Sequence, residues 1–493
     1  MKKVLILAVG CWLWAVGVSA QTVTQRIQKA FGQFEADSQL RHAISSLYVI
    51  DANTGEVVFD KNSQVGLAGA STQKVITATT AYELLGKDYQ YKTELAYKAD
   101  VYPYAKYLNS NFFIYGSGDP TLGSWRYTTT GDEFLKKLFA VIKDSVEGAQ
   151  YERRSTTVSV INDRFESNSI NDRWIWQDIG NYYGAMHSAV NWRENQFDIC
   201  FTPADKEGKS VQAGVAKPGY AQKMAVGIHS DEGLAINIDS LKTGKKGSGD
   251  NAYVYYKSGN EAVVKGTIPL GENEFTISAS HPNPGEYFVG ALKNYEENNF
   301  PKWDIMYFLT GSEKYFYGSR TTIPVIPDQP KIIYTYYSPT LDSITYWFLK
   351  KSINLYGEAL IKTLAYEKQG FGSTDSGLNI VKKFWKEKGL DPEELNIYDG
   401  SGLSPLNRLT THAQVEVLKF AKSRPWFSSF YYALPEYNGM KMKSGTISDV
   451  KGFCGYQRSK DGKEYIFSFL VNNYNGRTSA VVNKMYKVLD ELK

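Results

Sequence analysis

The chain has 493 residues, which is too long for one ordinary hydrophobic core, so two or three domains are expected. An apolar content of 42% and a charged content of 22% are typical of a globular protein and exclude a disordered one. With 56 basic and 52 acidic residues and no dominant Lys/Arg block, the charge balance does not favour a nucleic-acid partner.

The first 20 residues have the parts of a secretory signal peptide. A short basic stretch precedes an apolar run, and small residues at 18–20 form a cleavage site before Gln21. This run is short for a spanning helix, and no other run approaches the ~20 apolar residues that one needs. We therefore expect an exported protein, cleaved after Ala20, with no stable membrane anchor. Cys11 leaves a lipoprotein site as the alternative.

Residues 45–60 read as two strands joined by an Asn-Thr-Gly turn. Apolar residues then recur at helical spacing over 75–85, and Gly86 is a stop signal. Ser71 therefore lies at or near a helix N-terminus, with Lys74 one turn further along the same face. Taken alone, this pair fits a helix cap followed by a solvated lysine as well as a nucleophile with its base.

From about residue 90 to 335 the chain consists of short strand-like segments between turns, which predicts a β-rich region with one or two inserted subdomains. The clearest segments are 111–119, 156–163, 195–203 and 261–270. Residues 241–251 are rich in Lys and Gly and indicate an exposed loop.

Helical periodicity returns at Ser338, which is predicted to cap a helix with Pro339 at its first position. The run 338–370 is long enough for two helices. Further helices fit 376–389 and 410–421, strand-like segments follow at 440–459 and 464–474, and an amphipathic helix at 479–493 is expected to pack on the sheet.

Cys200 and Cys454 remain after cleavage and are too few for a disulfide scaffold. Buried free thiols are expected, and whether the two pair stays open. With five His and neither an HExxH motif nor a CxxC pair, the sequence does not favour a metal enzyme, and no cofactor is expected.

The pattern S-x-x-K is weak alone and occurs at both 71–74 and 448–451. Acyl-transfer enzymes that recognise penicillin also need S-x-N and then K-[S/T]-G on a strand. The first of these occurs at 169–171, 258–260 and 352–354, and the second at 242–244 and 443–445.

Order and local setting select one set of motifs. Residues 242–244 fall in the predicted Lys/Gly-rich loop, whereas 443–445 precede a strand–turn–strand pattern. Ser169 and Ser258 lie in polar loops, and Ser448 has no later K-[S/T]-G. The remaining candidates have the right order and lie between helices or on a strand: Ser71, Lys74, Ser352, Asn354, Lys443, Ser444 and Gly445.

Several segments resemble the class C low-molecular-mass penicillin-binding proteins, the D-alanyl-D-alanine carboxypeptidase/endopeptidases of serine peptidase family S13. These segments are 70–86, 350–365, 398–410 and 442–456, with shorter ones at 116–122 and 160–165. The resemblance spans most of the mature chain. The long separation of Ser71 from Ser352 is distinctive, because β-lactamases keep these motifs much closer.

The resemblance implies an α+β fold, in which a penicillin-binding/DD-peptidase helix-sheet domain carries two nested β-rich inserted domains. Residues 21–92 and 336–493 would form the catalytic domain. Residues 93–195 and 283–335 would form inserted domain II, and 196–282 the nested domain III.

It also implies roles for the candidates. Ser71 would attack the D-Ala carbonyl after Lys74, kept neutral by burial and by Lys443, takes its proton. The backbone N–H groups of Ser71 and Thr446 would hold the oxyanion. Ser352 would relay a proton to the leaving amine. Asn354 would hold a backbone amide of the substrate, and Lys443 with Ser444 would bind its terminal carboxylate.

Four positions depart from or extend this pattern. K-S-G replaces the usual K-T-G, but Ser444 keeps the hydroxyl group. Pro405 stands where the family often has a basic residue, which leaves open how the substrate side chain is held. Asp163, beside Asn162, is half of an expected acidic pair and a candidate substrate contact. Ser401 is a turn residue beside the site and a further candidate for substrate binding.

The sequence thus predicts a periplasmic serine D-alanyl-D-alanine carboxypeptidase/endopeptidase. It would act on peptidoglycan stem peptides and crosslinks through an acyl-enzyme at Ser71, and β-lactam antibiotics would acylate it. One alternative is a serine β-lactamase or esterase, against which the long insert and the lack of an obvious deacylating Glu loop argue. Another is a non-catalytic wall-binding protein, which would need no nucleophile. The balance of the two activities, the side-chain preference and the oligomeric state stay open.

Overall fold

The computed structural model describes residues 21–127, 132–147, 153–166, 170–217, 221–224, 227–230, 235–257, 261–310 and 330–493. The predicted signal peptide 1–20, Ser169 and the S-x-N pattern at 258–260 lie outside these ranges. Across these ranges, no helix combines the length and the apolarity needed to cross a membrane.

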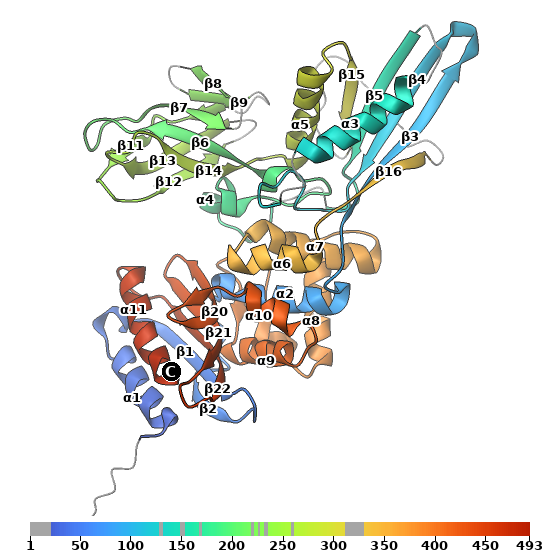
Figure 1. Cartoon of the computed structure of the whole chain (residues 1–493). Coiled ribbons are helices and arrows are strands. Elements are labelled where there is room, and N and C mark those ends of the chain that lie inside the picture. Colours follow the sequence, from blue (N-terminus) through green and yellow to red (C-terminus); the bar gives the residue numbers. More distant parts are fainter. Residues whose placement is uncertain are drawn as a thin grey trace, which may run out of the picture.

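A six-stranded antiparallel sheet joins the two ends of the chain, in the order β19-β20-β21-β22-β1-β2 (Figure 1). Its strands are β1 Ile44–Asp51, β2 Val57–Lys61, β19 Glu436–Tyr437, β20 Met440–Ile447, β21 Val450–Arg458 and β22 Glu464–Asn472. Helices α1 (Val23–Glu35) and α11 (Thr478–Leu489) bury their apolar stripes in one cluster with one face of the sheet. The predicted hairpin at 45–60 and the packing of the C-terminal helix are therefore confirmed.

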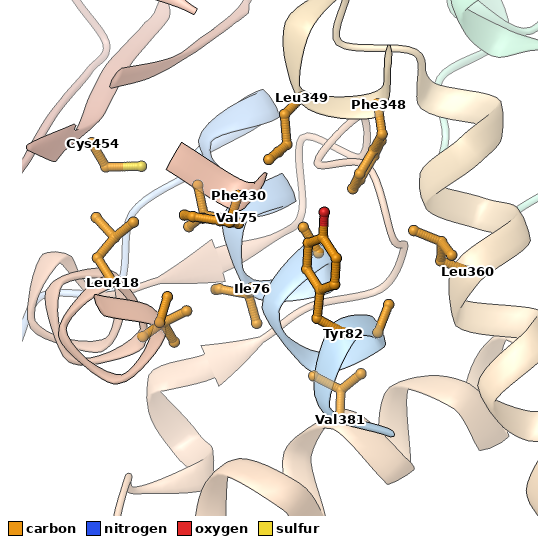
Figure 2. Close-up of a cluster of buried hydrophobic side chains, with 14 of the residues drawn as sticks. Val75, Ile76, Tyr82, Phe348, Leu349, Leu360, Val381, Leu418, Phe430 and Cys454 are labelled. Atoms are coloured by element: carbon orange, nitrogen blue, oxygen red, sulfur yellow. The ribbon is translucent and has the colours of Figure 1, made fainter. Parts of the chain in front are cut away.

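The other face of this sheet is covered by helices around the central α2 (Lys74–Leu85) (Figure 1). They are α6 Leu341–Lys350, α7 Asn354–Gln369, α8 Thr374–Glu387, α9 Thr411–Lys422 and α10 Phe427–Ala433. Figure 2 shows Val75, Ile76 and Tyr82 of α2 within the shared core, surrounded by side chains of these helices. Every residue of α2 from Lys74 to Tyr82 is buried, so its charged and polar side chains must find partners inside the protein.

The chain between α2 and α6 forms the inserted part. One five-stranded sheet has the order β15-β5-β4-β3-β16 and packs with α3 (Asp132–Glu147) and α5 (Pro284–Asn299). Its strands are β3 Lys92–Tyr102, β4 Tyr107–Tyr115, β5 Arg153–Ile161, β15 Ile305–Leu309 and β16 Lys331–Tyr337.

A second β-rich unit is nested inside the first and has its own core. A three-stranded sheet holds β14 Phe275–Ser280, β6 Gln196–Thr202 and β7 Gln212–Lys217. A six-stranded sheet holds β8 Ala221–Met224, β9 Gly227–Ser230, β10 Ala235–Asn237, β11 Leu241–Gly244, β12 Asn251–Tyr256 and β13 Glu261–Pro269. We propose that these sheets mark the three domains, with the boundaries given by the sequence reading.

Two local predictions are wrong. The helix predicted from Ser338 begins at Leu341 with Thr340 as its cap residue, because the buried Ser338 hydroxyl instead accepts a hydrogen bond from the backbone N–H of Tyr91 (2.9 Å). Residues 242–244 are not in a loop, because β11 pairs with Gly266–Pro269 of β13. This pairing comes from a distant segment, so the local Lys/Gly composition could not reveal it.

The remaining elements agree more closely with the predictions. Strands β4, β5, β6 and β13 overlap the four segments predicted in the middle region. The segment 440–459 holds two strands, β20 and β21, joined by the two-residue turn Ser448–Asp449. Cys200 in β6 and Cys454 in β21 are both buried and neither is in a disulfide, as expected.

Candidate active site

Ser71 and Lys74 lie at the start of the buried helix α2. A 3-10 turn, η2 Ala70–Gln73, leads directly into α2, and this turn sets the two side chains on one side. The Lys74 Nζ donates hydrogen bonds to Asn354 Oδ1 (2.6 Å) and the Ser401 carbonyl (2.7 Å), and it lies 2.9 Å from Ser71 Oγ. Lys74 is fully buried.

The environment of Lys74 favours a neutral amine. Burial, together with the nearby charge of Lys443, holds the pKa of Lys74 well below its usual range. The Asn354 Oδ1 and the Ser401 carbonyl are acceptors only, so the two hydrogens of a neutral amine point to them. The nitrogen lone pair then faces Ser71 Oγ, which is the arrangement of a nucleophile with its base.

Ser352 and Asn354 come from the predicted junction between two helices, α6 and α7. Ser352 has φ of +58°, a left-handed conformation that turns the chain sharply between the helices. Its Oγ accepts a hydrogen bond from Lys443 Nζ (3.0 Å). The Asn354 Nδ2 donates to the carbonyl of Tyr183 (2.8 Å), so both ends of this amide already have partners in the chain.

Strand β20 brings Lys443 and the residues after it against the Ser71 turn. A Cβ atom on Gly445 would lie 2.4 Å from the Gly69 carbonyl and 2.9 Å from the Ser71 nitrogen, so only glycine permits this approach. The Lys443 Nζ also donates to the Ser444 carbonyl (2.8 Å), and burial lowers the pKa of Lys443 to about 7.

The loop that carries Ser401 is fixed from within by Asp399. This buried carboxylate accepts hydrogen bonds from the backbone N–H groups of Gly402 (2.7 Å) and Ser404 (2.6 Å) and from the Trp174 indole (3.0 Å). A Cβ on Gly402, which has φ of +83°, would meet the Ala70 carbonyl at 2.0 Å. The loop is therefore locked against the η2 turn, and the Ser401 carbonyl is held in place beside Lys74.

A pocket of about 420 Å³ opens over Ser71. Ser71, Ser352, Asn354 and Thr446 line it from the catalytic part, together with Pro405 and Ser448. The inserted part supplies Asp178 and its neighbours Tyr182 and Tyr183. The size and the mixed polarity of this pocket suit a peptide-like ligand.

The structure does not bring every candidate to the pocket. Asp163 is exposed and is not among the lining residues, so the acidic pair expected near it does not reach the site. The Ser401 side chain is buried and only its carbonyl contributes, through Lys74. Ser444 and Gly445 lie on β20 beside the site, whereas Thr446 faces the pocket directly.

Asp178 is one of several lining residues that sequence reasoning missed. Its pKa is raised to about 6, because burial penalises the charge more than a hydrogen bond from Tyr183 stabilises it. It lies in the short helix α4 (Trp176–Ile179) of the inserted part, far from the motifs in sequence. No spacing rule links the two regions, so only the folded chain reveals this carboxylate.

The family model of the D-Ala-D-Ala carboxypeptidase 3 (S13) family matches residues 27–304 and 317–492. The chain belongs to this family. The resemblance drawn from the motifs is therefore confirmed, and the protein is a serine-type D-alanyl-D-alanine carboxypeptidase by class.

Curated relatives have similar lengths and carry the same activity in their names. The chain is 27% identical over 468 residues to a D-alanyl-D-alanine carboxypeptidase of Actinomadura sp. (strain R39), covering 89% of this chain and 80% of the relative. It is 22% identical over 445 residues to the D-alanyl-D-alanine carboxypeptidase DacB of Haemophilus influenzae, with 86% and 84% coverage.

The fold is also that of a solved protein. The crystal structure of penicillin binding protein 4 (dacB) from Haemophilus influenzae superposes with a TM-score of 0.73, at 17% identity, over 94% of this chain and 98% of that chain. This confirms the predicted α+β, multidomain penicillin-binding fold.

Proposed function

We propose that this family member removes terminal D-Ala through an acyl-enzyme at Ser71, with Lys74 as the base. The observation that carries this proposal is the bonding of Lys74, whose two fixed acceptors leave its lone pair facing Ser71 Oγ. Lys74 takes the hydroxyl proton as Ser71 Oγ bonds to the D-Ala carbonyl carbon. Expulsion of the terminal D-Ala amine leaves an ester, which water then hydrolyses.

The oxyanion is held by the backbone N–H groups of Ser71 and Thr446. The close approach of Gly445 to the Ser71 nitrogen supports this role, because it brings the β20 strand edge to the nucleophile. Loss of one such donor costs on the order of 3 kcal/mol of transition-state stabilisation.

Ser352 carries the proton toward the leaving amine, supported by its hydrogen bond from Lys443. Lys443, Ser444 and Thr446 attract and bind the terminal carboxylate. Because both ends of the Asn354 amide are already engaged, we assign this residue mainly to orienting Lys74 rather than to gripping the substrate.

The substrate is the stem peptide of peptidoglycan, and its crosslinks are a second substrate of the same site. The position of Asp178 in the pocket favours a peptide whose side chain carries an ammonium group. Such a group would pair with the carboxylate of Asp178 and offset the cost of burying its charge. Pro405, which also lines the pocket, offers no charge there. The signal-like sequence at 1–20 supports export to the periplasm.

β-Lactams acylate the same serine in this proposal. A complex of the Haemophilus influenzae protein with a novel β-lactam has been solved, and that chain superposes on this one with a TM-score of 0.67 at 16% identity.

Incubation of the purified protein with fluorescent penicillin and with a peptide ending in D-Ala-D-Ala tests the proposal. We expect a long-lived adduct and release of D-Ala, both abolished in Ser71→Ala. Rapid penicillin turnover without peptide cleavage would instead indicate a β-lactamase. Absence of an adduct, with wall binding unchanged in Ser71→Ala, would indicate a binding protein.

A further inference from the structure

Lys451 is a buried lysine beside the site to which the mechanism assigns no role. It belongs to the second S-x-x-K pattern, but Ser448 lies in the turn between β20 and β21, so the two residues do not share a helix face. Lys451 stands opposite Thr446 in the strand register and is 7% exposed. Its Nζ donates a hydrogen bond to Thr446 Oγ1 (2.8 Å) and lies 4.6 Å from the centre of the Phe453 ring.

Within the described ranges, no carboxylate pairs with Lys451. A buried ammonium group without an anion is costly, so such a group calls for a counter-charge from outside the chain. Burial lowers the pKa of Lys451 only to about 8, so the cation predominates at neutral pH.

The hydrogen bond to Thr446 fixes the direction of a hydroxyl group. An ammonium group has only donors, so Thr446 Oγ1 must accept from it, and the hydrogen of the threonine hydroxyl is left to donate elsewhere. Thr446 is exposed and lines the pocket that contains Ser71. The free hydrogen is therefore available to an acceptor in that pocket, with a positive charge directly behind it.

We propose that Lys451 is a positioning residue that, through Thr446, selects ligands with a free C-terminal carboxylate. It orients the Thr446 hydroxyl as a donor and supplies the counter-charge for the bound anion. This inference rests on the proposed function, because it assumes that the peptide terminus lies along β20. It adds a second cation to Lys443, placed on the neighbouring strand.

The test compares two peptides that differ in one group: one ends in D-Ala-D-Ala with a free carboxylate, the other with a carboxamide. Dissociation constants are measured by calorimetry in a Ser71→Ala background, so that binding is read without hydrolysis. We expect the acid to bind roughly ten- to hundred-fold more tightly, as for loss of one charge-assisted hydrogen bond. Lys451→Met should remove most of this preference, and Lys451→Arg should retain it.

Thr446→Val provides a second route to the same result. It should lower the acid preference as Lys451→Met does, and the double variant should lose little more, because the lysine acts through the threonine. Lys441→Met is the control and should leave the preference for the acid intact. Lys441 lies on β20, the strand of Thr446, and its ammonium group lies over the Tyr431 ring.

Equal loss of affinity for acid and amide in Lys451→Met would reduce this lysine to a structural role and overturn the inference. Equal or undetectable binding of both peptides in the Ser71→Ala background overturns it as well. Hydrolysis by the protein with Ser71 intact is followed in parallel. Failure of both hydrolysis and penicillin labelling would refute the proposed function. The preference for the acid over the amide is measured separately, in Ser71→Ala, and tests only the role of Lys451.

Discussion

At the scale of single residues, the proposed chemistry depends on the charge of Lys74. Two fixed acceptors, burial and a neighbouring cation all favour its neutral form. Another cation at this position could make the same hydrogen bonds. It could not take the proton from the Ser71 hydroxyl group.

Replacement of Lys74 by arginine separates these two requirements. A guanidinium group keeps its positive charge in proteins, so Lys74→Arg cannot act as a base. We expect the rate of acylation by fluorescent penicillin, measured in a stopped-flow instrument, to fall at least about 1000-fold. Lys362→Arg, at another buried lysine outside the pocket, is the control. Retention of rapid acylation in Lys74→Arg would exclude Lys74 as the base.

Glu358 of α7 is a buried acid that supports the Ser401 loop. Its carboxyl group accepts from the backbone N–H of Gly400 (3.2 Å), and burial together with the charge of Asp399 raises its pKa to about 8. The native state therefore holds a proton that the unfolded chain, with a Glu pKa of about 4.3, has already released.

This difference predicts the sign of a pH effect on stability. As pH rises from about 4.3 to 8, Glu358 lowers the free energy of unfolding by up to about 1.4 kcal/mol per pH unit, and the loss stops above the native pKa. The neutral isostere in Glu358→Gln should remove this contribution. Urea unfolding at several pH values gives the free energy of unfolding of the original protein and of Glu358→Gln. If the difference between these two free energies did not change with pH, Glu358 would be ionised in the native state.

At the scale of elements, the site depends on how closely β20 approaches the η2 turn. Neither segment forms the site alone, since η2 supplies Ser71 and β20 supplies Lys443 and the strand edge. The contact is made at Gly445, where any side chain would collide with backbone atoms.

Gly445→Ala tests this approach. The added methyl group must push β20 away from Ser71, so we expect kcat/KM to fall about 100-fold, as for a displacement of about 1 Å at a reacting centre. The stability cost should be about 1–3 kcal/mol. Gly32→Ala in α1 is the control, because the added methyl group would meet no atom within 4 Å. It should leave activity unchanged and raise the free energy of unfolding by about 0.5–1 kcal/mol. Unchanged kcat/KM in Gly445→Ala would contradict the proposed oxyanion site.

Except at the helix start predicted for Ser338, element prediction from sequence succeeded where the signal was local. The helix over 75–85, the junction at Ser352 and the strands of the middle region follow from periodicity and turn residues. The strand at 242–244 did not, because its partner β13 is distant and its own composition is that of a turn.

At the scale of the whole molecule, the inserted part completes the catalytic part rather than standing apart from it. The Tyr183 carbonyl anchors Asn354, and the Trp174 indole anchors Asp399. A third connection is the ion pair between Glu166 and the buried Lys362 of α7 (2.9 Å). These contacts hold the part of the chain that carries Asp178 against the part that carries Ser71.

Glu166→Gln tests the third connection. It keeps the shape of the side chain but leaves the buried Lys362 without its anion, so the free energy of unfolding should fall by about 2 kcal/mol. Glu133→Gln breaks an exposed ion pair with Lys137 and should change the free energy of unfolding by less than about 0.5 kcal/mol. Urea unfolding measures both. Lys362→Met added to Glu166→Gln should recover part of the loss, and no recovery would exclude the unpaired charge as its cause.

The sequence by itself determined the family, the fold class and the ordered set of motifs, because these depend on residue type and order along the chain. Only the tertiary structure decided which atoms of those residues act. The Ser401 carbonyl, not the Ser401 hydroxyl group, accepts the hydrogen bond from Lys74. Asp163 lies outside the pocket, whereas Asp178 lines it. The tertiary structure also placed Lys451 behind Thr446. The physical reason is that these contacts join segments that are distant in sequence or cross a strand pair, and their distances are set by packing rather than by spacing.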